Sequence, residues 1–157
     1  MKKLKNLIIL RHGPFEGRGF LTTEGKAHVS ERARQLKKLC GLDPAATTIV
    51  CSRELRTLMT AQCMISVLGL EELRGCCHQQ FFSNDVMCDT SGAIEVIKRY
   101  GENYENLIVV THSEMAATLP HVFCLDVISL TDTMFRSVGY GQGFVINLEK
   151  RICEFVN

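Results

Sequence analysis

The chain has 157 residues, of which 46% are hydrophobic and 22% are charged, a composition typical of one globular domain with a single core. Its formal net charge of +1 gives no electrostatic reason to expect nucleic acid or an anionic membrane as a partner. The apolar run that follows the basic N-terminal residues stops at Arg11, well short of the roughly 7–15 residues of a secretory signal. No apolar stretch approaches the ~20 residues of a membrane span, so we expect a cytoplasmic protein.

The cysteines are scattered and form no Cys-x-x-Cys pair, which favours free thiols in a reducing compartment. The group Cys76-Cys77-His78, with Cys88 further along, has a spacing that matches no common pair of zinc ligands. We therefore expect no metal. The eight cysteines are Cys40, Cys51, Cys63, Cys76, Cys77, Cys88, Cys124 and Cys153.

The first predicted element is a buried strand over residues 4–10, an apolar run that ends at the sequence Arg-His-Gly-Pro. A helix follows, in which Thr22 or Thr23 is the N-cap and the apolar residues recur at helical spacing. This helix runs to about residue 39 and ends at Gly41, the residue type that most often closes a helix.

A second short strand, rich in β-branched residues, is predicted over residues 47–51. Ser52 is the expected N-cap of the next helix, which runs to about residue 68 and ends at Gly69. Residues 76–82 are predicted to form a short edge strand.

The remaining elements follow the same alternation of helix and strand. They are a helix capped by Asp89, Thr90 or Ser91 and ending near Tyr100, a strand over 107–111, a helix from Ser113, and a hairpin of strands 144–148 and 152–156 joined by Glu149-Lys150-Arg151.

Strands that are separated by helices must be joined by crossover connections, which favours a largely parallel sheet with helices on both faces. We therefore predict a three-layer α/β/α architecture for residues 1–157 as a single domain without a lid. Open sheets of this kind bind ligands at the carboxyl ends of their strands.

Basic side chains follow three of the predicted strands. The first strand ends in Arg11-His12-Gly13, Arg56 lies one helical turn beyond the second, and the third ends in His112. Because these strand ends meet at one edge of the sheet, we expect a pocket of positive charge and hydrogen-bond donors there. Guanidinium groups match phosphate oxygens in a bidentate way, and helix N-termini also favour anions, so the pocket suits a phosphate.

A histidine in such a pocket has a chemical role available to it. Neutral imidazole is a nucleophile toward phosphorus, and its pKa near neutrality leaves a useful neutral fraction. Arginines and a second histidine would stabilise the charge on the transferring group. We expect His12 to form a phosphohistidine that water then hydrolyses.

These residues resemble the histidine phosphatase superfamily, which includes the cofactor-dependent phosphoglycerate mutases, and the resemblance extends over most of the chain. The matching segments are Arg11-His12-Gly13, Leu21-Thr22-x-x-Gly25, Ser52-x-x-x-Arg56-x-x-x-Thr60-Ala61 and Val109-Val110-Thr111-His112. The resemblance implies a phosphoglycerate mutase-like fold with His12 as the phosphorylated nucleophile. It also implies that Arg11, Gly13, Arg56 and His112 bind the phosphoryl group. Neither a metal nor an organic cofactor is expected, because arginines and histidines supply the positive charge.

Some positions depart from the family's pattern. Phe15 stands where a small or polar residue is common, and Arg53 replaces a common proline, where we expect it to point to solvent. Glu114, close to the expected phosphate, is interpreted as a helix N-terminal acid that favours the dipole. The general acid that many members use has several candidates: Asp85, Glu16, Asp89 and Glu114, of which Asp89 is better explained as a helix cap.

The short segment between Gly69 and Asp89 and the uncertain general acid make the small SixA-type phosphohistidine phosphatases the most similar branch. Phosphohistidine is a good leaving group, and an open cleft admits a protein surface. Three alternatives stay open: a small-molecule phosphomonoesterase, a phosphoglycerate mutase-like enzyme, and a module that binds phosphorylated partners without turnover. The expected partner is a phosphorylated protein or a small phosphomonoester, and the sequence does not identify which.

Two other interpretations are disfavoured by spacing. A cysteine-based phosphatase needs five residues between its cysteine and arginine, whereas Cys51 and Arg56 are separated by only four and the loop lacks glycines. The glycine-rich run at residues 139–143 precedes a strand instead of following one, so it predicts a turn or a bulge before the last hairpin and not a nucleotide loop.

Overall fold

The computed structural model describes residues 1–71, 76–84, 87–133 and 135–157. Among these residues no helix combines the length and the hydropathy needed to cross a membrane. The strands are β1 (Asn6–Arg11), β2 (Phe15–Glu16), β3 (Phe20–Leu21), β4 (Thr47–Cys51), β5 (Asn106–Thr111), β6 (Gly143–Asn147) and β7 (Ile152–Val156). The helices are α1 (Thr23–Cys40), α2 (Leu55–Leu68), α3 (Thr90–Tyr100) and α4 (Ser113–Asp126), with short 3-10 turns η1 (Pro44–Ala46) and η2 (Gln79–Phe81).

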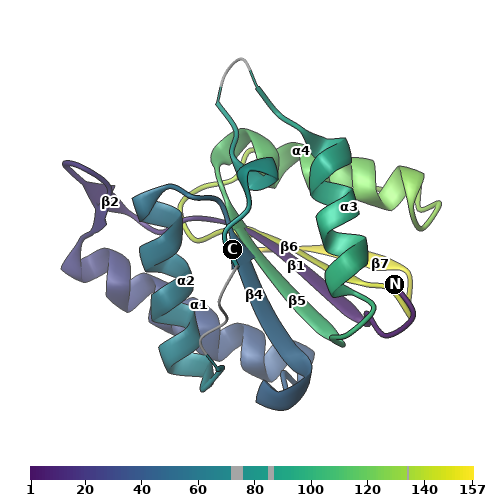
Figure 1. Ribbon diagram of the computed structural model, residues 1–157, viewed down its shortest axis with the longest axis horizontal. Helices are drawn as coiled ribbons and strands as arrows, with labels where there is room; N and C mark the ends of the chain where they lie inside the picture. Colours follow the sequence, from purple (N-terminus) through teal and green to yellow (C-terminus); the bar gives the residue numbers. More distant parts are fainter. Residues whose placement is uncertain (72–75, 85–86, 134) are drawn as a thin grey trace.

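The main sheet has the strand order β4-β5-β1-β6-β7. Strands β4, β5 and β1 are parallel, whereas β6 and β7 form an antiparallel hairpin against β1. Helices α1 and α2 lie on one side of this sheet and α3 and α4 on the other (Figure 1). The predicted three-layer α/β/α fold with a largely parallel sheet is therefore confirmed.

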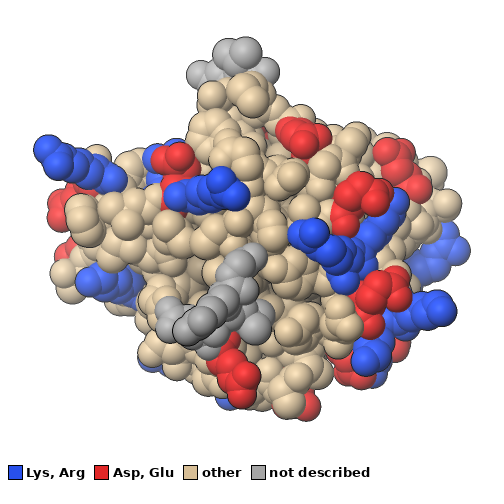
Figure 2. All heavy atoms as spheres, in the orientation of Figure 1, with Lys and Arg blue, Asp and Glu red and all other residues tan. Residues whose placement is uncertain are grey.

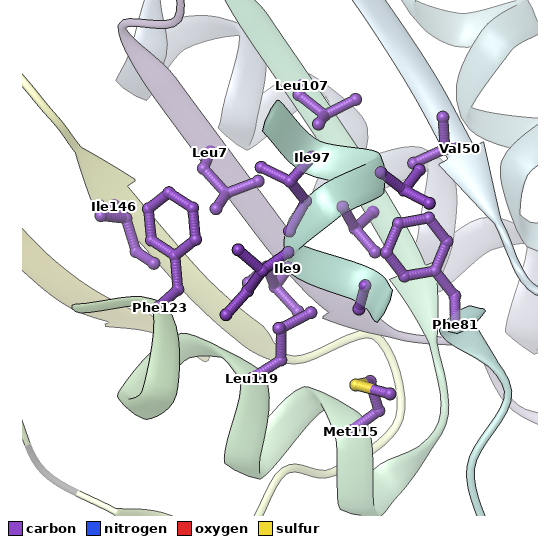
Figure 3. Packing of buried hydrophobic residues seen from close by; sticks show 14 of the residues in the cluster. Leu7, Ile9, Val50, Phe81, Ile97, Leu107, Met115, Leu119, Phe123 and Ile146 are labelled. Atoms are coloured by element: carbon purple, nitrogen blue, oxygen red, sulfur yellow. The ribbon is translucent and has the colours of Figure 1, made fainter. Parts of the chain in front are cut away.

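Strand β1 contributes to the core on both faces of the sheet because successive side chains point in opposite directions. Ile8 and Leu10 pack in the cluster beneath α1 and α2. Leu7 and Ile9 pack on the opposite side with α3 and α4, where Phe123 of α4 joins them (Figure 3). Burying each such side chain contributes roughly 1.5–3 kcal/mol, so the centre of the sheet is the best-anchored part of the fold.

The predicted helix ends are mostly confirmed. The Thr22 hydroxyl accepts a hydrogen bond from the Gly25 amide at 2.9 Å, which caps α1. Helices α1 and α2 end at Gly41 and Gly69, whose φ angles of 61° and 70° are left-handed. Asp89 caps α3 through the Gly92 amide at 2.8 Å.

The structure corrects two predictions. Ser52 is not the N-cap of α2, because the helix begins after Glu54, which makes no side-chain cap, and the Ser52 hydroxyl is buried elsewhere. Residues 76–82 do not form a regular strand: one parallel bridge joins Cys77 to the edge strand β4, and the chain then turns into η2. That turn buries Phe81 completely in the core.

The face of the molecule seen in Figure 2 carries basic and acidic side chains side by side. This mixture agrees with the net charge of +1. A local concentration of cationic groups therefore has to be looked for among partly buried residues.

Candidate active site

The two predicted histidines lie on neighbouring parallel strands. His12 directly follows β1, and its amide donates to the Thr111 carbonyl at 3.0 Å, which extends the ladder by one residue. His112 directly follows β5 and is the N-cap of α4. The ring centroids are 5.6 Å apart, and both side chains are 3% exposed. The backbone ladder thus sets the spacing of the two rings.

His12 is held as a neutral ring with one defined tautomer. Its Nδ1 lies 2.9 Å from the Gly13 carbonyl oxygen. A carbonyl only accepts, so the proton is on Nδ1 and the lone pair is on Nε2. Burial, with smaller contributions from the charges of Arg56 and Arg11 and against the opposing effect of the Gly13 bond, lowers the pKa of His12 to about 4. His12 therefore presents a nucleophilic nitrogen at neutral pH.

His112 has both ring nitrogens engaged. Nδ1 accepts from the Arg56 guanidinium, with Nη2 at 3.2 Å, and guanidinium groups only donate. Nε2 therefore carries the proton and donates to the Ser52 hydroxyl at 2.8 Å. Burial lowers the pKa of His112 to about 3, with a further contribution from the charge of Arg56.

The Ser52 hydroxyl continues this chain of hydrogen bonds. It lies 2.8 Å from the Thr57 hydroxyl, which donates to the Glu54 carbonyl at 2.7 Å. Ser52, Thr57 and His112 are all buried. The residue expected to cap α2 instead orients the second histidine, because its hydroxyl is the acceptor that the buried Nε2–H needs.

The two arginines near the histidines come from different elements. Arg56, in the first turn of α2, is partly exposed, and its Nη1 lies 3.9 Å from a Glu54 carboxylate oxygen. Arg11, the last residue of β1, donates from Nη1 to the Val138 carbonyl at 3.0 Å, and its guanidinium lies 4.1 Å from the Tyr140 ring centroid. The buried Nε of Arg11 has no hydrogen-bond partner among the described residues.

Gly13 has a packing role in this arrangement. Its amide donates to the Thr60 hydroxyl at 3.0 Å, so in this structure the amide is already used. A Cβ at Gly13 would lie 2.5 Å from a methyl group of Val29 on α1, a distance that a side chain cannot occupy. Glycine lets the chain leave β1 close against the helix.

Three aromatic rings surround the histidines, and we call them the aromatic rim: Phe15, Phe82 and Tyr140. Phe15 and Tyr140 contact His12, with centroid distances of 5.2 and 5.5 Å, and Phe82 lies 5.3 Å from His112. Tyr140 comes from the glycine-rich run, which forms the predicted turn through a Gln142 amide bond to the Gly139 carbonyl. The sequence pattern identifies Phe15 as a departure from the family's pattern, but sequence reasoning missed the other two rings and the hydrogen bond of Ser52. For Tyr140, its position between Gly139 and Gly141 in a predicted turn was the one sequence feature that could have drawn attention to it.

The candidate acids lie in different places. Glu16 is exposed on β2, and Asp89 is used as the cap of α3. Glu114 is in the first turn of α4, as expected, and accepts a 3.4 Å bond from the Ser83 hydroxyl. Asp85 lies outside the described residues, and Arg53 is exposed, as predicted.

No protein-family model and no curated protein sequence matches this chain. Solved structures do. The protein histidine phosphatase SixA complexed with tungstate matches with a TM-score of 0.70 and 17% identity, over 97% of this chain and 94% of that one. A phosphoglycerate mutase from Plasmodium falciparum matches with a TM-score of 0.63 and 18% identity, over 98% and 89% of the two chains.

A phosphoglycerate mutase from Bacillus anthracis gives a TM-score of 0.62 and 13% identity over 100% of this chain and 95% of that one. These likenesses extend over nearly the whole length of both partners in each comparison. At such low identity they establish architecture and not activity. The chain shares the fold of the SixA phosphatase and of the phosphoglycerate mutases, which is the fold that its sequence motifs predicted.

Proposed function

We propose that this protein is a phosphatase that takes a phosphoryl group onto Nε2 of His12 and then releases it to water. The observation that carries the proposal is the state of His12. It is a buried, neutral imidazole whose Nδ1–H is fixed by Gly13, and it lies beside two arginines and a second neutral histidine. This is the arrangement that nucleophilic attack on phosphorus requires.

The cationic groups supply the phosphate site. Arg56 is 27% exposed, so its guanidinium is free to turn from His112 toward an incoming phosphoryl oxygen. A nearby dianion raises the pKa of His112, which then takes a proton on Nδ1 and donates it to the phosphoryl group. An oxygen that accepts from Arg11 Nε would also satisfy a buried donor, whose unpaired state costs about 1–3 kcal/mol.

The reaction has two displacements at phosphorus. The Nε2 lone pair of His12 forms a bond to phosphorus while the bond to the leaving group breaks and the leaving group takes the electron pair. Water then attacks phosphorus, the P–Nε2 bond breaks, and inorganic phosphate departs while the neutral imidazole is restored. Arg56, Arg11 and protonated His112 stabilise the equatorial oxygens in both steps.

Protein phosphohistidine is the substrate class that we favour. Its imidazole leaves as a neutral group when the other ring nitrogen is protonated, so it depends little on a general acid. The aromatic rim offers flat surfaces beside His12 and His112 against which a planar leaving group can pack. The similarity to SixA, a protein histidine phosphatase that binds tungstate, supports the same choice.

The catalytic step is tested with para-nitrophenyl phosphate in the presence of a chelator. We expect His12→Ala to lose at least roughly 10³-fold in turnover, because the nucleophile is absent. His121→Ala is the matched control, since His121 lies in the second half of α4, where its ring contacts the Thr133 hydroxyl, and its loss should leave wild-type activity. Trapped enzyme should carry an acid-labile, alkali-stable phosphoryl group. Undiminished turnover by His12→Ala would refute the mechanism.

The substrate class is tested separately with a phosphohistidine protein and a small sugar phosphate. We expect release of phosphate from the protein at a higher kcat/KM than from the sugar. Efficient hydrolysis of the sugar phosphate with none of the phosphohistidine would favour a small-molecule phosphomonoesterase. Binding of phosphate without any turnover would favour a recognition module.

A further inference from the structure

Three cysteine thiols gather at the end of β4, outside the histidine site. Cys51 is the last residue of β4 and is completely buried. Cys76 and Cys77 lie on the segment that pairs with it, where the Cys51 amide donates to the Cys76 carbonyl at 2.9 Å. The Cys77 sulfur is 3.9 Å from that of Cys51 and 3.7 Å from that of Cys76, and all three lie within 4.8 Å of one another. We call this group the thiol cluster.

The sulfur spacing fits a thiophilic metal ion. A zinc–thiolate bond is about 2.3 Å long, which places the sulfurs of a tetrahedral site about 3.8 Å apart. The Cys76–Cys77 and Cys51–Cys77 sulfur distances of 3.7 and 3.9 Å lie on either side of this value. Backbone hydrogen bonds on both sides of Cys51, to Cys76 and from the His78 amide at 2.8 Å, hold the segments together without a ligand.

We propose that Cys51, Cys76 and Cys77 bind one Zn²⁺ ion as three thiolates, with water as the fourth ligand. Cys76 and Cys77 are partly exposed, which gives the ion a route into the site and leaves room for water. Three thiolates and one Zn²⁺ carry a net charge of −1. Arg53 is exposed two residues beyond Cys51. Arg99 lies over the ring of Tyr100, whose hydroxyl contacts His78, so both arginines place positive charge on this side of the molecule.

This ligand set differs from the group Cys76-Cys77-His78 with Cys88, which lies close together in the sequence. His78 is directed elsewhere, because its Nε2 lies 3.0 Å from the Tyr100 hydroxyl. Cys88 lies near Met115, with its sulfur 3.9 Å from the thioether. The third thiol comes instead from Cys51, which is 26 positions from Cys77 and is brought to it by the parallel bridge. No local spacing motif reveals such a set.

A disulfide between Cys51 and Cys77 is the competing use of the same sulfurs. It would require the two atoms to close from 3.9 Å to about 2.05 Å and would leave Cys76 unused. A bound cation stabilises all three thiolates together.

The test uses the full-length chain, reduced and stripped of metal, with Zn²⁺ as the titrant in calorimetry and Co²⁺ as a spectroscopic probe. We expect one ion per chain and a sulfur-to-cobalt charge-transfer absorption that Zn²⁺ displaces. Cys76→Ser and Cys77→Ser should each weaken Zn²⁺ binding by at least about 100-fold. Cys63→Ser, which alters a thiol beside Ser30 on α1, is the matched control and should bind as the wild type does.

Thermal unfolding of each variant without metal shows whether it is folded, and Cys51→Ser is omitted because its buried sulfur supports the core. Zn²⁺ binding that is equally strong in Cys76→Ser, Cys77→Ser and Cys63→Ser would overturn the proposal, as would no binding by the reduced wild type. Formation of a Cys51–Cys77 disulfide in air, with no uptake of Zn²⁺ after reduction, would assign the cluster to redox chemistry instead. His12→Ala should bind Zn²⁺ normally, so the result is independent of the phosphatase proposal.

Discussion

Replacement of Ser52 by alanine tests whether the hydrogen bond to His112 positions the second histidine. Ser52 is 0% exposed and His112 is 3% exposed, so water cannot replace the lost hydroxyl. The Nε2–H of His112, now 2.8 Å from the Ser52 oxygen, would remain buried without an acceptor. Leaving such a donor unpaired costs about 1–3 kcal/mol, and we expect the free energy of unfolding to fall by that amount.

The same change should affect catalysis more than binding. Without Ser52 the imidazole of His112 can rotate or change tautomer, and the Nδ1 that now faces Arg56 is no longer fixed. We expect kcat for para-nitrophenyl phosphate to fall roughly 10–100-fold, which corresponds to about 1.4–2.8 kcal/mol of transition-state stabilisation, with a smaller change in KM. The carboxyl end of β4 should stay in place, because its backbone hydrogen bonds are unaffected.

Urea denaturation and steady-state kinetics measure the two effects on one sample. Ser91→Ala is the matched control, because this serine is exposed at the start of α3 and its loss should change stability by less than about 0.5 kcal/mol. A Ser52→Ala protein that unfolds like the control and keeps the wild-type kcat would show that the hydroxyl does not position His112.

Further predictions concern His12, His112, Arg56 and Gly13. With a pKa of about 4, His12 stays neutral at pH 5.5, so its ring-proton resonance should not shift between pH 7.5 and 5.5; a midpoint near 6.5 would contradict the assigned burial. Because the unfolded chain binds protons near pH 6.5 that folded His12 and His112 exclude until about pH 4 and 3, urea denaturation should show stability falling as pH drops from 6.5 toward 4. Arg56→Lys should lower kcat/KM by roughly 10²–10³-fold, since an ammonium cannot present two donors in one plane. Wild-type kinetics of this variant would show that Arg56 does not bind the phosphoryl group. Gly13→Ala should lose about 1–3 kcal/mol of stability by contact with Val29, and Val29→Ala in the same chain should recover part of it; equal stability of both proteins would show that the contact is relieved elsewhere.

The sequence was sufficient for the fold because its local signals agree with one another. Apolar runs marked β1, β4 and β5, and glycines marked the ends of α1 and α2. Parallel strands place their carboxyl ends at one edge of the sheet, where such sheets bind ligands. The sequence therefore predicted that side chains far apart in the chain meet at that edge. The register between β1 and β5 could not be predicted in the same way. A crossover connection implies that the two strands are parallel, but only their long-range pairing fixes which residues lie side by side.

The parts of the site that sequence reasoning missed depend on side-chain direction. Ser52 is of a residue type that often caps helices, but it is buried beside His112, and its hydroxyl bonds to that histidine instead. Phe82 follows the turn η2 in a segment predicted to be an edge strand, and Tyr140 lies in a glycine-rich turn, so no pattern predicted that their rings would face the histidines. The thiol cluster was missed for a related reason, because the bridge between Cys51 and Cys77 joins an edge strand to an irregular segment.

The position of β1 and β5 in the middle of the sheet has a consequence for how the molecule opens. Each of these strands has a hydrogen-bonded neighbour on both edges and buried side chains on both faces. Amides in such strands exchange with solvent only in the rarest, most extensive openings, whereas termini and loops exchange in frequent local ones. The distance between the two histidines should therefore survive fraying of β7, and deuterium uptake should reach residues 6–12 and 106–112 last.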